Sequence, residues 1–464
     1  MIPQKLKIDQ AALERPGWRD YQADLKWDVA KKRLIKNILK LSAVVLVILV
    51  MVYGIFGGPG GKSFYHSLTD YFFLSHDDKK DAHLNNVKLI DKRDARTLLK
   101  SISFANLKNK SLDFFSDGRK FQVYTSLDIR LQNFLQKKLN VSTSRHIGIV
   151  GMDPVTGKVL SMVSFDKTDP SNNPCVDNRF PAASIFKIVT ASAAIEKCGF
   201  TPDSKLTYNG RKHTLYKSQL KNRKNKYTNR VTFRDSFAQS VNPVFGKIGT
   251  LFLGKTTLEK YALAFGFNRD IDFEIQLEPS AVYLSDEPYQ WAEVACGFNQ
   301  ETKLSPLHGA MIASAIINQG KIMEPSIVDQ IVDQKGEIIY RNRLVTINQA
   351  ITPETSKILN SLMATTIRSG TCKKAFRGYR KDKILSKLNI GGKTGSMDTK
   401  SHDARYDWFV GFAEEKDGPK KIALSVIVAH EKYIGPRASY YARIAMKEYF
   451  ANYFKKNHNL ASKI

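Results

Sequence analysis

The 464-residue sequence predicts an α/β fold in which an antiparallel β-sheet is flanked by helices and carries an all-helical subdomain, preceded by one transmembrane helix. Three features of the sequence support this prediction. Apolar, β-branched runs lie near both ends of the segment 119–456, helical patterns lie between them, and a long uncharged stretch lies near the N-terminus. With 42% hydrophobic and 25% charged residues, the chain has the composition of a folded globular protein.

The uncharged stretch runs for 18 residues from Leu41 to Gly58, close to the ~20 residues that cross a bilayer core. Basic residues and no acidic residue occupy positions 31–40, so the positive-inside rule places the N-terminus in the cytoplasm. A cleaved signal peptide and a buried core helix are the alternatives. We expect a cytoplasmic tail at 1–36, a membrane anchor at 37–58, and a juxtamembrane linker or small module at 59–118.

The net charge of +28 by itself favours a nucleic-acid partner, but an external location disfavours one. We therefore expect no nucleic-acid partner. The spacing of the four cysteines matches no zinc pattern, and we expect no metal. Cys175 and Cys198 flank one predicted helix, and they form either a disulfide or two free thiols.

The main domain begins with a predicted helix at Ile129–Leu139. Two strand patterns follow, and turn residues at 153–157 join them into a hairpin. Two more strands and a final helix lie near the C-terminus. We predict that strands from both ends form one sheet around a helical insertion: Ile147–Met152, Val159–Phe165, Trp408–Ala413, Ile422–Ala429 and the helix Tyr440–Phe454.

A helix from Ser184 to Ile195 is apolar on all sides, which predicts that it is buried. Lys187 is its one charge, and a buried lysine is costly unless it is paired or neutral. Because positions i and i+3 share a helix face, Lys187 is positioned to act as the base for a Ser184 nucleophile. In the alternative interpretation, Ser184 only caps the helix and Lys187 extends its amine to solvent.

Two further motifs follow in the chain. Ser240-Val241-Asn242 lies in a turn between two predicted helices, where the serine relays a proton and the asparagine binds a peptide; alternatively, Asn242 is only an N-cap before a proline. Lys393-Thr394-Gly395 follows a strand that ends in two glycines, which permit close approach of the backbone.

In this order the three motifs resemble those of the transpeptidase domain of penicillin-binding proteins, over about residues 120–455. The segment Ser184–Ile188 is more similar to monofunctional class B members than to bifunctional class A members. The resemblance implies a β-lactamase/D,D-peptidase-like fold for residues 119–456. The segment 59–118 departs from the family, because it is shorter than a class B pedestal and lacks its Arg-Gly-x-Ile-x-Asp-Arg signature. Other matching segments are Tyr124–Gln132, Met152–Gly157, Leu304–Leu307 and Trp408–Phe412.

The resemblance also implies a role for each residue of the motifs. Ser184 attacks the penultimate D-Ala carbonyl of a peptidoglycan stem peptide, Lys187 takes the serine proton, and Ser240 passes a proton to the leaving D-Ala. Backbone N–H groups of Ser184 and Ser396 form the oxyanion hole. No cofactor is implied. The substrate-binding residues are Asn242, Lys393, Thr394, Gly395 and Ser396.

The implied protein is a D,D-transpeptidase of the bacterial cytoplasmic membrane, with a single span and an extracytoplasmic catalytic domain. It binds β-lactams covalently, and a membrane glycosyltransferase is an expected partner. The alternatives are a D,D-carboxypeptidase or endopeptidase, a β-lactam sensor, and a cell-wall scaffold. A β-lactamase is disfavoured, because the nearest string to its deacylating motif, Glu274–Glu278, ends in glutamate instead of asparagine.

Two basic runs separate the motifs. Arg211–Arg230 contains eight basic and no acidic residues. The second run precedes Lys393. Either both are solvated loops, or they capture an anionic polymer such as carboxylate-rich peptidoglycan. The second run consists of Lys373, Lys374, Arg377, Arg380, Lys381, Lys383 and Lys387.

Overall fold

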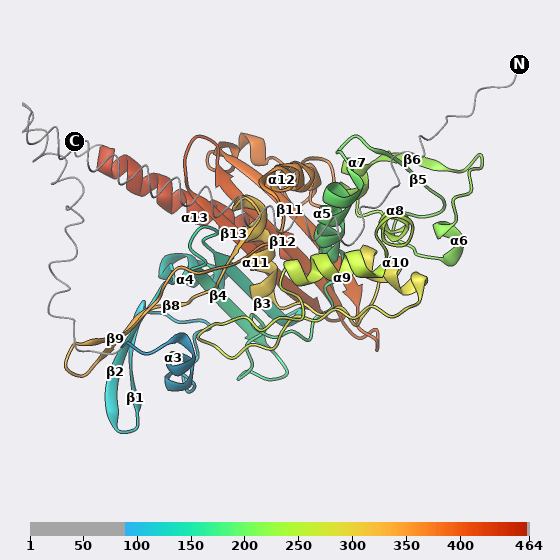
Figure 1. The fold of residues 1–464 in the computed structure, drawn as a ribbon. Helices are drawn as coiled ribbons and strands as arrows, with labels where there is room; N and C mark the ends of the chain where they lie inside the picture. Colours follow the sequence, from blue (N-terminus) through green and yellow to red (C-terminus); the bar gives the residue numbers. More distant parts are fainter. Residues whose placement is uncertain (1–88, 462–464) are drawn as a thin grey trace, which may run out of the picture. The chain divides into compact units, whose positions relative to one another are not determined.

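The computed structural model describes residues 89–461 (Figure 1). The expected tail at 1–36, the expected anchor at 37–58 and residues 59–88 of the expected linker lie outside the described residues. Within the described part of the chain, no helix combines the length and the apolar character needed to cross a bilayer.

The central sheet is antiparallel and has five strands in the order β11-β12-β13-β3-β4. Strand β13 pairs with β3, so strands from the two ends of the domain share one sheet, as predicted. The strand β11 lies at the edge of the sheet, where one side of its backbone has no partner strand among the described residues. The bounds are β3 Ser144–Met152, β4 Val159–Asp166, β11 Leu388–Asp398, β12 Arg405–Glu415 and β13 Lys421–His430.

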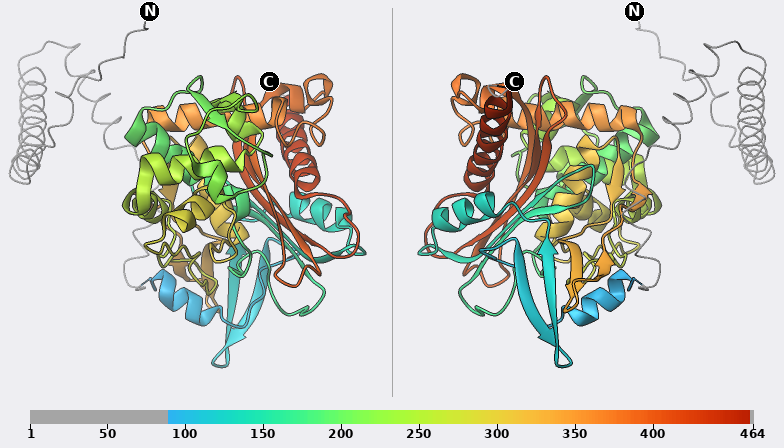
Figure 2. Two further views of the ribbon diagram at one scale, coloured as in Figure 1. Left: turned by 90° about the vertical axis from the view of Figure 1, so that its right-hand side faces the viewer. Right: turned by 90° about the vertical axis from the view of Figure 1, so that its left-hand side faces the viewer.

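Helices cover both faces of this sheet (Figure 2). On one face lie α4 (Ile129–Lys138) and α13 (Ala438–Ala461). On the other face lie α11 (Pro306–Ile317) and α12 (Pro353–Arg368), and α5 (Lys187–Cys198) packs on α12. Because both faces are covered, the strand β13 is buried along nearly its whole length.

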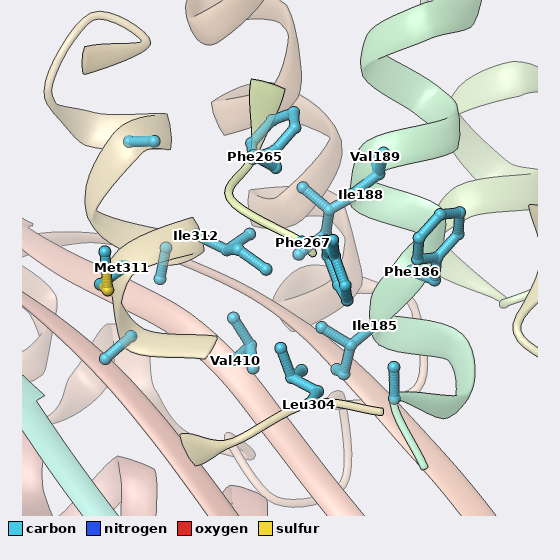
Figure 3. Packing of buried hydrophobic residues seen from close by; sticks show 14 of the residues in the cluster. Ile185, Phe186, Ile188, Val189, Phe265, Phe267, Leu304, Met311, Ile312 and Val410 are labelled. Carbon is cyan, nitrogen blue, oxygen red and sulfur yellow. The ribbon is translucent and has the colours of Figure 1, made fainter. Parts of the chain in front are cut away.

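Helix α5 passes through the centre of a helical subdomain, as its apolar sequence predicts (Figure 3). Side chains of the preceding turn and of α5, such as Ile185 and Ile188, pack with Phe267, Leu304 and Ile312 in one buried cluster. The surrounding elements are α7 (Phe233–Ala238), α8 (Asn242–Lys247), the π-helix η4 (Ile248–Leu253), α9 (Gly254–Ala264) and α10 (Pro288–Cys296).

The expectation of an all-helical subdomain is wrong in one respect. Strands β5 (Lys205–Tyr208) and β6 (Asn229–Thr232) pair antiparallel within it, with the short helix α6 (Lys217–Leu220) between them. Their sequences, KLTY and NRVT, contain the β-branched and aromatic residues that favour strands. The basic residues around them obscured this pattern.

A second sheet has the order β1-β2-β8-β9. The expected border at residue 118 falls in the turn between β1 and β2, and the compact unit that contains both strands begins at Val87. A two-stranded sheet pairs β7 with β10. The bounds are α3 Lys92–Leu98, β1 Ser111–Ser116, β2 Arg119–Thr125, β7 Lys321–Met323, β8 Val328–Asp333, β9 Ile338–Arg341 and β10 Thr346–Gln349.

All four cysteines are free thiols, so the disulfide between Cys175 and Cys198 is the wrong alternative. The Cys175 Sγ is buried and lies 3.2 Å from the Val163 carbonyl oxygen. The Cys198 Sγ lies 3.8 Å from the Phe252 carbonyl oxygen. Each sulfur therefore occupies its own packing environment.

Candidate active site

Ser184 lies in a 3-10 turn, η3 (Ala183–Phe186), that continues directly into α5. The predicted helix is confirmed, with a tighter first turn than expected. Ala183 has a φ of 47°, a left-handed conformation that costs an alanine about 1–2 kcal/mol. Gly297 permits this arrangement, since a Cβ added there would lie 1.8 Å from the Ala183 carbonyl oxygen. Ser184 is thus positioned by a strained residue and a close glycine contact.

The Lys187 amine is completely buried next to Ser184. Its Nζ lies 2.8 Å from Ser184 Oγ and 2.8 Å from Asn242 Oδ1, and it also contacts the Cys296 carbonyl oxygen. Burial lowers the pKa of Lys187 to about 8. The alternative interpretation, in which Ser184 is an N-cap and the Lys187 amine reaches solvent, is therefore wrong.

These contacts orient the lone pair of a neutral Lys187 amine. A neutral amine has two N–H donors and one lone pair. The Cys296 carbonyl oxygen and Asn242 Oδ1 can only accept, so they take the two N–H groups. The lone pair then faces Ser184 Oγ, as general-base catalysis by this amine would require.

Asn242 is the first residue of α8, and Val241 occupies the N-cap position, so the N-cap interpretation of Asn242 is wrong. Its Nδ2 donates to the His213 carbonyl oxygen at 3.1 Å. Because the Asn242 Nδ2 donates to His213, the Asn242 Oδ1 is the atom that faces Lys187.

Strand β11 brings Lys393 to Ser240. The Lys393 Nζ lies 3.0 Å from Ser240 Oγ and 2.9 Å from the Thr394 carbonyl oxygen. The amine is buried, and burial followed by the charge of Lys187 lowers its pKa well below the usual value. Ser240 has a φ of 56°, so the backbone at this motif is also strained.

The opposite wall of the site is the edge strand β11 at Gly395. A Cβ added there would lie 3.3 Å from the Ser184 backbone nitrogen, so the strand passes directly beside Ser184. A cleft of about 1120 Å³ opens between these elements. Its lining includes Ser184, Ser240, Asn242, Thr394 and Ser396, and the two lysines lie buried beneath it. The structure thus brings all the residues of the three motifs together.

Sequence reasoning missed a carboxylate that supports the third motif. Asp407 of β12 is the register partner of Ser396, and its Oδ1 accepts from Ser396 Oγ at 3.2 Å. Its Oδ2 accepts from the Ala438 backbone N–H at 2.9 Å, and Arg437 Nη1 donates to Oδ1 at 3.4 Å. Asp407 directly precedes the Trp408 motif, but only the strand register reveals its position beside Ser396.

The structure separates Glu274 from the cleft. This buried carboxylate accepts from Ser326 Oγ at 2.6 Å, the Ile327 N–H at 3.1 Å and Tyr340 OH at 3.0 Å. None of these residues lines the cleft. Glu274 is therefore a structural group of the second sheet and does not activate a water at Ser184.

A serine paired with a buried lysine one turn later, and faced by a second serine–lysine pair, defines the class of serine acyltransferases that use a lysine base. The family model of the penicillin-binding protein transpeptidase domain matches residues 147–454. This match covers more than half of the chain, which therefore belongs to that family.

Relatives of known name agree with this assignment. Stage V sporulation protein D of Bacillus subtilis is 26% identical over 318 residues, which are 63% of this chain and 47% of the relative. Peptidoglycan D,D-transpeptidase PbpA of Mycolicibacterium smegmatis is 24% identical, over 60% of this chain and 61% of the relative. The chain thus spans about half to three fifths of the length of these curated relatives.

Solved structures show the same fold. The crystal structure of PBPA from Mycobacterium tuberculosis has a TM-score of 0.58 at 21% identity, over 70% of this chain and 81% of that chain. A penicillin G acyl-enzyme complex of penicillin-binding protein A from the same organism has a TM-score of 0.56 at 22% identity, over 70% and 79% of the two chains.

Proposed function

We propose that this chain is a monofunctional peptidoglycan D,D-transpeptidase that cross-links stem peptides through a Ser184 acyl-enzyme and is acylated by β-lactams. The observation that carries the proposal is the position of Lys187 Nζ, 2.8 Å from Ser184 Oγ and with its two N–H groups taken by other acceptors. The name of the PbpA relative and the acyl-enzyme complex of the solved relative support it.

In the first half-reaction, Ser184 Oγ attacks the penultimate D-Ala carbonyl while Lys187 takes its proton. Backbone N–H groups of Ser184 and Ser396 stabilise the oxyanion, at typically ~3 kcal/mol per donor. The C–N bond then breaks, Ser240 passes a proton to the leaving D-Ala amine, and an ester on Ser184 remains. In the second half-reaction, the amine of a neighbouring stem attacks this ester, and the proton returns to Ser184.

The residues around Ser184 bind the substrate. Lys393, Thr394 and Ser396 hold the terminal carboxylate, and Asn242 holds the donor peptide. The donor backbone adds to the edge strand β11 at Gly395, which lies close to the Ser184 backbone because no side chain separates the strand from the η3 turn.

The proposed location is the bacterial cytoplasmic membrane. The uncharged stretch within 37–58 and its basic flank support a single-span anchor, a cytoplasmic tail at 1–36 and an extracytoplasmic catalytic domain. A membrane glycosyltransferase is the proposed partner, because a cross-linking enzyme requires newly polymerised glycan strands as its substrate.

The acceptor is tested with a thioester analogue of the donor peptide and a D-amino acid as the amine. Mass spectrometry measures the ratio of aminolysis to hydrolysis products. We expect aminolysis to dominate and to disappear in Ser184→Ala. Ser164→Ala is a matched control, because Ser164 belongs to a similar Ser-x-x-Lys string in β4 that lies outside the cleft. Hydrolysis alone would indicate a D,D-carboxypeptidase and would contradict the proposal.

A further inference from the structure

The basic run at 211–230 includes α6 and the start of β6, which pairs with β5 at one side of the domain (Figure 1). All eight of its basic side chains are exposed, and none forms an ion pair with any residue in the described range 89–461. Some exposed cations elsewhere in the described domain do have partners, such as Lys167 with Glu431 at 2.7 Å and Lys447 with Asp382 at 2.6 Å. The charge of this surface is therefore not neutralised by the domain itself.

The surface is hollowed as well as basic. A depression of about 540 Å³ is lined by the cations Arg211, Lys221 and Arg223 and by the exposed ring of Tyr216. Asn209 and Asn225 add amide groups. Within the part of the chain that the structure describes, no acidic side chain lines it. This combination of cations, amides and an aromatic ring suits a ligand that carries carboxylates and sugar hydroxyls.

The basic surface is joined to the catalytic residues. The Asn242 backbone N–H donates to the Lys212 carbonyl oxygen at 2.7 Å, and the Asn242 side chain donates to the His213 carbonyl oxygen. His213 itself lines the catalytic cleft. A polymer held on this surface would thus lie next to the entrance of the active site.

The second basic run, at 373–387, adjoins the cleft on the side of β11. Its Lys374 lines the cleft, and Thr371, just before the run, contacts the Thr394 hydroxyl. The acid within the run, Asp382, is paired with Lys447 of α13 at 2.6 Å, and no basic residue of the run forms an ion pair within the described chain. Unpaired cations therefore adjoin the cleft from two segments of the chain.

We propose that the hollowed surface at 211–230 is an accessory binding site for the carboxylate-bearing peptidoglycan strand, and that the run at 373–387 continues this contact along the cleft. The inference rests on the proposed function, because the strand held here is the one that supplies a stem peptide to Ser184. Many weak ion pairs with the strand would together give a measurable affinity. Salt should weaken this affinity, because the Debye length is about 8 Å at physiological ionic strength.

The test is co-sedimentation of the full-length protein with purified insoluble peptidoglycan, at low and at high salt. A triple variant, Lys221→Gln, Arg223→Gln and Lys224→Gln, removes charge from the surface. The matched control, Lys335→Gln, Arg341→Gln and Arg343→Gln, removes three exposed, unpaired cations around β9, which lies at the far side of the domain (Figure 1). Thermal unfolding of each variant verifies that it is folded.

We expect the first triple variant to bind peptidoglycan roughly tenfold more weakly at low salt, and the control to bind like the wild type. Amidation of the peptidoglycan carboxylates should reproduce the loss with the wild-type protein. Equal binding by the two triple variants, or full binding to amidated peptidoglycan, would overturn the proposal. The same sedimentation is carried out with vesicles of anionic phospholipid. If the first triple variant binds these vesicles more weakly but binds peptidoglycan like the wild type, the proposal would be overturned in favour of a membrane contact.

Failure of the proposed function is detected separately, by acylation of the wild-type protein with a fluorescent penicillin. Absence of acylation would refute the chemistry at Ser184 whatever the sedimentation shows. Acylation together with equal sedimentation of the two triple variants would refute only the accessory site.

Discussion

At the scale of single residues, the proposed chemistry depends on the protonation state of Lys187. The amine is a base only when neutral, and burial lowers its pKa to about 8. As the pH rises toward this value, the neutral fraction grows, so the acylation rate constant for a penicillin should rise about tenfold per pH unit. It should level off above about pH 8. Stopped-flow fluorescence between pH 6 and 9.5 measures this profile, and a rate independent of pH would exclude Lys187 as the base.

Asp407 is expected to act through Ser396. The variant Asp407→Asn keeps the shape of the side chain but removes the charge that Ser396, Ala438 and Arg437 contact. Hydrogen bonds to a charged group contribute typically 1.5–3 kcal/mol, so the free energy of unfolding should fall by about 2 kcal/mol. A displaced Ser396 should also slow acylation by roughly tenfold.

Asp403→Asn is the control for that prediction. Asp403 lies in the same β11–β12 hairpin and pairs with Arg145, but it does not contact Ser396. Denaturant unfolding and acylation kinetics compare the two variants. An equal loss of acylation rate in both would show that Asp407 only stabilises the hairpin.

At the scale of elements, the site is formed by the close approach of the η3 turn, the end of α10 and the edge strand β11. Two glycines that both end a helix provide a test of how much this close contact between the elements matters. Gly199 and Gly297 each follow a helix, with φ of 64° and 65°. An added Cβ meets nothing within 4 Å at Gly199 but lies 1.8 Å from the Ala183 carbonyl oxygen at Gly297.

Gly199→Ala should therefore cost only the strain of a left-handed alanine, about 1–2 kcal/mol of unfolding free energy. Gly297→Ala adds a displacement of the η3 turn, and its acylation rate should fall by at least roughly tenfold. Acylation kinetics and denaturant unfolding measure both effects. Comparable acylation by the two variants would contradict the proposed role of this contact.

The elements that the sequence predicted best are those with long, regular apolar patterns. The strands that became β3, β4, β12 and β13 and the buried helix α5 needed only hydrophobic periodicity. The pair β5–β6 was missed because each strand is four residues long and lies among basic residues. Short strands of this kind are stabilised by their neighbours, which a local pattern does not contain.

At the scale of the whole molecule, the fold brings together motifs that lie far apart in the chain. Ser184, Ser240 and Lys393 were predicted from their local sequence, and the central sheet with its helical subdomain explains why they meet. The Cys296 carbonyl oxygen and Asp407 could not be predicted, since both contribute through tertiary contacts. A main-chain oxygen carries no sequence signal, and a carboxylate paired across strands requires the register.

The central claim is that Ser184 is the nucleophile of an acyltransferase. The most direct test is intact mass spectrometry of the full-length protein after incubation with a penicillin, comparing the wild type with Ser184→Ala and Ser164→Ala. We predict one stable adduct in the wild type and in Ser164→Ala, and none in Ser184→Ala. Rapid turnover of the drug, or an adduct that persists in Ser184→Ala, would contradict the account.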